Sequence, residues 1–195
     1  QSLGEAERPT PAAEEVLVRV HAASIHIGDC HGIRGVPYLM RPIFGLRHPK
    51  ARIPGTDLAG VVEGVGSSVT RFKPGDEVFG SGKGAFAEYA CAKEEQLLPK
   101  PPDLSFEEAA AVGVSAVTAL VGIRDKGHVA AGQHVLVNGA SGGVGTYAVQ
   151  IAKSLGAEVT AVCSTSHVER IRSLGADHVI DCTREDFTEG ARATT

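Results

Sequence analysis

The chain has 195 residues, of which 43% are hydrophobic and 22% are charged, and its formal net charge is -4. This composition is ordinary for a soluble globular protein, and the length allows one large domain or two modest ones. No basic stripe that would bind nucleic acid and no apolar run long enough to span a bilayer stands out, so we expect neither partner.

Cysteine usage indicates the compartment. The four cysteines, Cys30, Cys91, Cys163 and Cys182, are scattered and form no CxxC pair. Such spacing is typical of reduced thiols in an intracellular protein, rather than of a disulfide framework or a structural zinc lobe. We therefore expect a cytoplasmic protein. Because the chain begins at Gln1 rather than at Met, a targeting segment ahead of it stays open.

The part of the chain before residue 100 is predicted to be rich in short strands. Strands are expected at 16–25, 59–66, 72–80 and 85–92, with a loop rich in Gly, Pro and Arg between the first two. A turn is predicted at Pro74-Gly75, because proline presets φ and glycine permits a positive φ. Short strands at this spacing favour a small barrel or sandwich.

A long helix is predicted to follow these strands. Ser105 and Glu108 stand three residues apart, which is the pattern of a capping box at the start of a helix. The stretch from there to Ile123 is mostly apolar. We therefore expect a helix that is mostly buried.

The segment VLVNGASGGVGTYAVQIAK (135–153) predicts a strand, a glycine turn and a helix. A turn so poor in side chains lets a phosphate approach bare backbone N–H groups, and the positive end of the helix points at the same place. The strand EVTAVC (158–163) completes a βαβ unit, so the segment is expected to bind the pyrophosphate of NAD(P). The residues expected to contact it are Ala140, Ser141, Gly142, Gly143, Val144 and Gly145. The alternative is an ordinary corner without a ligand.

The end of the second strand of this unit indicates which nicotinamide cofactor binds. A carboxylate there would accept a hydrogen bond from the adenosine 2′-OH and reject a 2′-phosphate, but none is present. Hydroxyl and N–H groups of Ser164, Thr165 and Ser166 can bind a phosphate, with Arg170 close enough to add charge. We therefore expect NADPH rather than NADH. The alternative is that these residues only cap the helix that begins near His167.

The last elements complete only half of a dinucleotide-binding domain. A helix at 168–174 and a strand at 178–182 are predicted, whereas a complete domain has two βαβαβ halves. We therefore expect the chain to be a fragment of a longer protein, without its first strand and inactive by itself.

Several segments, in this order, resemble the medium-chain dehydrogenase/reductase superfamily, and specifically its quinone oxidoreductase (zeta-crystallin-like) branch. The matching segments are 22–35, 55–80, 84–89, 115–120, 132–153 and 174–182. The resemblance implies an α/β protein with a GroES-like β domain over 1–103, connecting helices over 104–131, and the first half of a Rossmann domain, a doubly wound parallel sheet, over 132–195. It implies an active site in the cleft between the two domains.

The resemblance also bears on metal. His26 occupies the position at which zinc-dependent alcohol dehydrogenases of the superfamily have a cysteine. Thr56 and Asp57 occupy the positions of the His-Glu pair in those enzymes, and Val114 falls at about the position of their second cysteine. Catalytic zinc needs three protein ligands, and only His26 and Asp57 remain. We therefore expect no zinc and no metal ligands, with adventitious metal at those two residues left open.

His26 and Thr118 are the expected catalytic contacts. Quinone reductases commonly carry Asn at the position of His26, and imidazole can likewise contact the nicotinamide or its ribose; the alternative is a loop histidine with local hydrogen bonds. The resemblance points to Thr118 on the nicotinamide side. The proton donor stays open among Tyr38, Tyr89 and solvent.

Taken together, these patterns predict a zinc-independent, NADPH-dependent oxidoreductase that transfers hydride to quinones or to activated carbonyls and enones. Such substrates accept hydride without a strong Lewis acid. The alternatives are a zinc-type alcohol dehydrogenase and a non-catalytic NADPH-binding protein. We expect a small-molecule substrate and a homodimer for the full-length protein.

Overall fold

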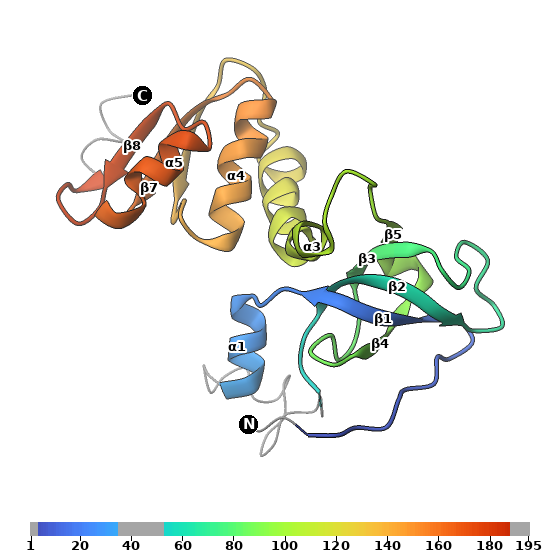
Figure 1. The fold of residues 1–195 in the computed structure, drawn as a ribbon. Coiled ribbons are helices and arrows are strands. Elements are labelled where there is room, and N and C mark those ends of the chain that lie inside the picture. Colours follow the sequence, from blue (N-terminus) through green and yellow to red (C-terminus); the bar gives the residue numbers. More distant parts are fainter. Residues whose placement is uncertain (1–3, 35–52, 188–195) are drawn as a thin grey trace. The chain divides into compact units, whose positions relative to one another are not determined.

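The computed structural model describes residues 4–34 and 53–187. The chain divides into two compact units, Gln1–Val114 and Ser115–Thr195 (Figure 1). Residues 35–52, which include the candidate proton donor Tyr38, lie outside the described part.

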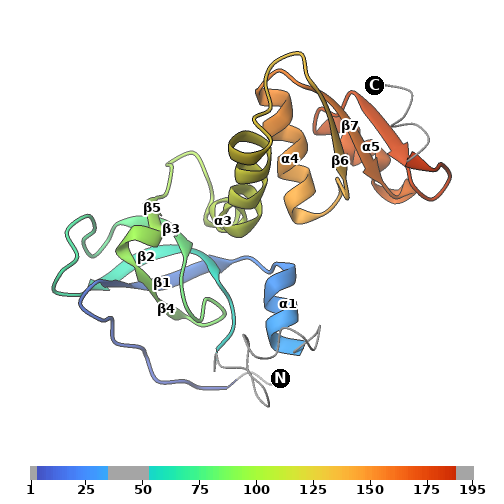
Figure 2. The same cartoon turned by 180° about the vertical axis from the view of Figure 1, so that it is seen from behind.

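The first unit contains a five-stranded antiparallel sheet in the order β4-β1-β2-β3-β5. Its strands are β1 (Glu15–Ala23), β2 (Asp57–Val65), β3 (Glu77–Ser81), β4 (Tyr89–Lys93) and β5 (Leu97–Pro99). Strands β1 and β2 run side by side in both views (Figures 1 and 2). The four expected strands are confirmed, although β3 begins five residues and β4 four residues later than expected. Strand β5 was not expected, because three residues ending in proline carry no alternating pattern.

Among the described residues, the larger buried cluster of the first unit lies on one face of this sheet, and a smaller one contains Ala59, Ala109 and Ala110. Val16 and Val18 alternate along β1, and they pack with Leu58, Val78 and Leu97 from the neighbouring strands. The turn before β3 is confirmed, since Gly75 has a φ of +95°. This sheet supports the loop that carries His26.

A short helix, α1 (Ile27–Arg34), replaces the first part of the loop expected after β1. Its sequence, IGDCHGIR, holds two glycines, so local propensity gives no helix signal. The Asp29 carboxylate accepts a hydrogen bond from the N–H of His26 (3.0 Å) and thereby caps the first turn. The expectation of a loop at these residues is therefore wrong, because capping outweighs propensity here.

Helix α3 (Phe106–Leu120) continues into a π-helical turn at Val121–Lys126. The capping box is confirmed: Ser105 N–H donates to Glu108 Oε2 (2.9 Å), and Glu108 N–H donates to Ser105 Oγ (3.1 Å). The expected burial is wrong. Among the described residues of α3, Ala109, Ala110 and Ala119 are buried in a core and Phe106 packs against one, but Val117 remains 57% exposed.

The same helical segment corrects the expectation about membrane-spanning runs. Phe106–Lys126 forms 21 helical residues with a mean hydropathy of 1.5, which suffices by length and composition to cross a membrane. Charged residues flank the apolar part of this segment: Glu107 and Glu108 begin it, and Arg124, Asp125 and Lys126 end it. A core helix of a water-soluble protein meets the same criterion, so the segment is weak support for membrane contact.

The second unit contains a parallel sheet in the order β6-β7-β8, with a helix between successive strands (Figures 1 and 2). The elements are β6 (His134–Asn138), α4 (Gly143–Ser154), β7 (Glu158–Cys163), α5 (Val168–Ser173) and β8 (His178–Asp181). Val149 of α4 and Ile171 of α5 are fully buried in the core that these helices form with the sheet. The expected βαβαβ half is confirmed. Its parallel strands bring the ends of β6, β7 and β8 to one edge, where nucleotides bind in such sheets.

Candidate functional site

The turn from β6 to α4 is built almost entirely from backbone contacts. Gly139 has a φ of +74°, a conformation that favours glycine. The N–H of Gly142 donates to the carbonyl of Gly139 (3.0 Å) and closes the turn. Ala140 is fully buried, and its N–H donates to the carbonyl of Val162 (2.9 Å), which ties the turn to β7. The turn is therefore held from both sides.

Gly145 is required by a close approach of helix and turn. A Cβ atom at this position would lie 2.3 Å from the carbonyl oxygen of Gly139 and 2.7 Å from the Cα of Ala140. Both atoms belong to backbone that cannot yield cheaply. The alanine that stands in the first glycine place of the motif, Ala140, has no such restriction.

The start of α4 presents hydrogen-bond donors to solvent. Thr146 N–H donates to the carbonyl of Gly142 (3.0 Å), so the N–H groups of Gly143, Val144 and Gly145 precede the first intrahelical donor and have no acceptor one turn earlier within the helix. No side chain caps this end of the helix, and Gly142, Gly143 and Val144 are exposed. Three donors at the positive end of a helix suit an anion. The donor set fits a pyrophosphate, with half-buried Ser141 beside it.

The turn after β7 places Ser164, Thr165 and Ser166 at the same sheet edge. The hydroxyl oxygens of Ser164 and Ser166 lie 3.4 Å apart. No side chain caps the 3₁₀ turn Thr165–His167 or helix α5. The alternative that these residues only cap the next helix therefore lacks the hydrogen bonds it requires. Arg170 is exposed on α5.

Thr165 has a partner that sequence reasoning missed. Its hydroxyl donates to Asp181 Oδ2 (2.5 Å), at the end of β8. This hydrogen bond, followed by those from Thr183, lowers the pKa of the Asp181 carboxyl, which is therefore ionised at neutral pH. The signal available in the sequence was an acid ending the third strand, but spacing alone did not pair it with Thr165.

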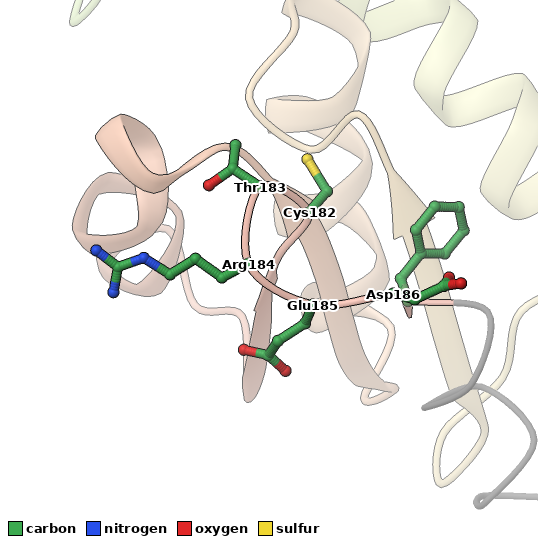
Figure 3. Close-up of a pocket in the computed structure, with 6 residues that line it drawn as sticks. Cys182, Thr183, Arg184, Glu185 and Asp186 are labelled. Atoms are coloured by element: carbon green, nitrogen blue, oxygen red, sulfur yellow. The ribbon is translucent and has the colours of Figure 1, made fainter.

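A pocket of about 370 Å³ lies directly beyond β8. Residues 182–187 line it, and Figure 3 shows Arg184 and Glu185 extending outward from this loop. Exposed Cys182 is part of the lining, whereas Cys163, at the end of β7, is buried, and that burial raises the pKa of its thiol.

Thr118 lies on α3, one turn beyond Ser115. A Cβ atom on Gly143 would lie 2.9 Å from Ser115 Oγ, so this part of α3 is close to the start of α4. Thr118 itself is exposed. Because residues three apart share a helix face, Thr118 continues the face that meets the glycine turn.

His26 uses its ring locally. Its Nδ1 accepts a hydrogen bond from Gly28 N–H (3.0 Å), so the neutral ring carries its proton on Nε2. Nε2 is buried without a hydrogen-bond partner among the described residues, although it lies 3.4 Å from Asp29 Oδ2. That separation is within ion-pair range but lacks hydrogen-bond geometry. This arrangement favours the alternative of a locally bonded histidine, and its catalytic role stays a prediction.

Asp57 holds three elements of the first unit together. It is 1% exposed, and its carboxylate accepts hydrogen bonds from Val114 N–H (2.8 Å), Ser81 Oγ (3.3 Å) and Ser24 Oγ (3.4 Å). A carboxylate with these partners is a structural acceptor rather than an open metal ligand. Within residues 4–34 and 53–187, no group of three or more His, Cys, Asp or Glu could hold a metal ion.

The candidate proton donor Tyr89 lies on β4. Its ring is half-buried, and the guanidinium of Arg8 lies over it at 4.3 Å from the centroid. This cation–π contact gives the ring a packing role in the sheet. Tyr38 lies outside the described residues.

Comparison with known families matches both units. The model of the alcohol dehydrogenase GroES-like domain matches residues 12–102, and that of the zinc-binding dehydrogenase family matches residues 143–195. The chain is 40% identical over 182 residues to a chloroplastic quinone-oxidoreductase homolog of Spinacia oleracea, covering 89% of this chain and 54% of the relative. The chain thus spans about half the length of the curated relatives it matches.

Two solved structures are similar to both units. The quinone oxidoreductase from Coxiella burnetii matches with a TM-score of 0.86 and 29% identity, over 97% of this chain and 60% of that one. The Escherichia coli quinone oxidoreductase in complex with NADPH matches with a TM-score of 0.82 and 29% identity, over 95% of this chain and 56% of that one.

Proposed function

The chain belongs to the medium-chain dehydrogenase/reductase superfamily, and on this basis we propose that the full-length protein is a zinc-independent, NADPH-dependent oxidoreductase acting on quinones or activated carbonyls. The observation that carries the proposal is the start of α4, which no side chain caps and where Gly142, Gly143 and Val144 are exposed beside the glycine turn. Membership supports a nicotinamide cofactor. We propose the preference for NADPH over NADH and the independence from zinc from the residues of this chain, beyond what membership implies.

In this proposal the start of α4, the turn after β7 and Thr118 of α3 each contact a different part of the cofactor. The N–H groups of Gly143, Val144 and Gly145 bind the pyrophosphate, and the hydroxyls of Ser164 and Ser166 bind the 2′-phosphate. Thr118 contacts the nicotinamide side. When bound, the nicotinamide supplies the hydride, so the protein's task is positioning rather than activation of the acceptor. The NADPH complex of the similar Escherichia coli enzyme supports the same cofactor.

Zinc independence is supported by the candidate metal ligands of the first unit, which are already engaged in hydrogen bonds. Asp57 already accepts three hydrogen bonds, and the lone pair of His26 Nδ1 is directed at Gly28 N–H. Catalytic zinc needs three protein ligands, and Thr56 and Val114 stand where zinc enzymes have further ones.

Steady-state NADPH oxidation by the full-length protein tests the function. With a panel of quinones and enones, we expect turnover that a chelator leaves unchanged, and purified protein without stoichiometric zinc. Loss of activity on chelation, with recovery on adding zinc, would favour an alcohol dehydrogenase of the zinc type. Binding of NADPH without turnover of any acceptor would favour a non-catalytic NADPH-binding protein.

Ser164→Asp is expected to weaken binding of NADPH by about a hundredfold and binding of NADH by less than about threefold. A carboxylate at the end of β7 repels a 2′-phosphate but accepts a hydrogen bond from a 2′-OH. Titration calorimetry of the full-length protein measures both dissociation constants. Ser173→Asp makes the same change on the exposed surface at the end of α5 and is expected to alter neither constant appreciably. Equal losses for both cofactors at Ser164→Asp would contradict the assignment.

The homodimer and the cytoplasmic location stay predictions. The spinach relative is named as a chloroplastic protein, so relatives of this chain include organellar ones. Size-exclusion chromatography with light scattering on the full-length protein measures the oligomeric state.

A further inference from the structure

Asp181 stands out because the proposed function leaves it without a role. It is the last residue of β8, and its register partner is Cys163, the last residue of β7. The side chain of Asp181 is therefore next to the turn that begins at Ser164. It is only 8% exposed, although it is charged. A buried charge in a folded protein requires partners, because an unpartnered one is costly.

The partners of Asp181 come from both sides of this edge. From the β7 side, the Thr165 hydroxyl donates to Oδ2 (2.5 Å). From the loop after β8, Thr183 donates to Oδ1 through its N–H (3.0 Å) and its hydroxyl (2.7 Å). The two threonine hydroxyl oxygens also lie 2.7 Å apart, so two hydroxyl protons serve three short contacts. Asp181 thus joins the turn after β7 to the loop shown in Figure 3.

The charge of Asp181 is balanced within this cluster. Arg184 Nε lies 3.5 Å from Oδ2, and the other donors are directed at the carboxylate oxygens. A carboxylate compensated in this way adds little repulsion toward a phosphate nearby.

The hydrogen bond from Thr165 to Asp181 determines which hydroxyl groups the turn after β7 can offer to a ligand. Thr165 stands between Ser164 and Ser166, and its hydroxyl is directed at Asp181. The two flanking hydroxyl oxygens remain paired with each other at 3.4 Å, which is a weak contact that a stronger acceptor can replace. A phosphate oxygen can accept from both hydroxyls only while the residue between them stays in this position.

We propose that Asp181 is a positioning residue for cofactor choice: by holding Thr165, it keeps the hydroxyls of Ser164 and Ser166 placed for the 2′-phosphate of NADPH. This inference rests on the proposed function, because it presupposes that the turn after β7 binds that phosphate. NADH has no phosphate there, so its affinity changes little when the hydrogen bond between Thr165 and Asp181 is lost. Asp181 acts through Thr165 and is not itself a phosphate ligand.

Asp181→Asn and Thr165→Val in the full-length protein test the inference. Asn keeps the shape but turns an amide N–H₂ toward hydroxyl or N–H donors, and Val removes the Thr165 hydroxyl at nearly constant volume. Each variant is expected to weaken NADPH binding about tenfold and to leave NADH binding within about twofold. Because both substitutions remove the same contact between Thr165 and Asp181, the double variant is expected to lose little more NADPH affinity than either single variant. Thr165→Ser keeps the hydroxyl and is expected to retain the wild-type ratio.

Asp177→Asn is the matched control. Asp177 lies just before β8, at the opposite end of the strand, where it accepts from Val159 N–H (2.7 Å) and Lys153 Nζ (2.8 Å). The same chemical change there is expected to lower the melting temperature and to leave the ratio of NADPH to NADH affinity unchanged.

The outcomes separate the inference from the proposed function. If wild-type protein binds NADH alone or no nicotinamide cofactor, the proposed function fails. If wild-type protein binds NADPH but Asp181→Asn and Thr165→Val weaken both cofactors equally, Asp181 only supports the fold and the inference is overturned. Tighter NADPH binding in Asp181→Asn would overturn it as well, since it would reveal uncompensated repulsion. If Asp181→Asn fails to fold, Thr165→Val carries the same comparison.

Discussion

Gly145→Ala is expected to lower the stability of the second unit by about 3 kcal/mol and its melting temperature by roughly 6–12 °C. The added Cβ would lie 2.3 Å from the Gly139 carbonyl oxygen and 2.7 Å from the Ala140 Cα. Relief requires helix α4 to move away from the turn, which also displaces the N–H groups at its start. NADPH binding should therefore be lost. Thermal unfolding and titration calorimetry of the full-length protein measure the two effects.

Gly142→Ala is the matched variant for this glycine turn. Gly142 has a φ of -75°, and the one atom within 4 Å of an added Cβ is the Gly139 carbonyl oxygen, at 3.3 Å. We expect its melting temperature to fall by less than about 3 °C, because the Gly139 carbonyl has to shift by only a few tenths of an ångström. Since Gly142 is exposed at the start of α4, its methyl group is expected to reduce cofactor affinity without unfolding. An unchanged melting temperature in Gly145→Ala would show that the helix does not approach the turn as described.

Asp57→Ala is expected to lower the free energy of unfolding of the first unit by about 3 kcal/mol. The substitution leaves Val114 N–H and the hydroxyls of Ser24 and Ser81 without their acceptor and creates a cavity. Gly113→Ala should act in the same direction, since its Cβ would lie 2.4 Å from Asp57 Oδ1. Urea denaturation of the full-length protein measures both changes.

Asp76→Ala provides the comparison for Asp57. Its carboxylate accepts one hydrogen bond, from Lys73 N–H (2.9 Å), in the exposed turn before β3. The expected loss is about 1 kcal/mol, because water can replace the carboxylate there. A loss at Asp57 no larger than that at Asp76 would contradict the structural role. A fall in bound metal in Asp57→Ala would instead point to a ligand.

Elements that close within a few residues agree with the sequence-based predictions, whereas elements that depend on other contacts do not. The capping box of Ser105 and Glu108 and the turn at Gly75 each close within four residues, so local chemistry predicts them. Helix α1 was missed because it depends on a cap at Asp29 rather than on propensity. The burial of α3 was overestimated because an apolar composition does not say which faces find a partner.

For this protein, the sequence alone determined the βαβαβ order of the second unit and the glycine turn, since hydrophobic periodicity and positive φ are properties of short segments. Only the tertiary structure decided what the carboxylates do. Asp181 meets Thr165 across 16 residues, and Asp57 meets Val114 across 57. It likewise decided that Gly145 faces backbone and that His26 turns its ring toward Gly28. Which distant donor a side chain meets depends on how strands and helices pack, and no local pattern records that.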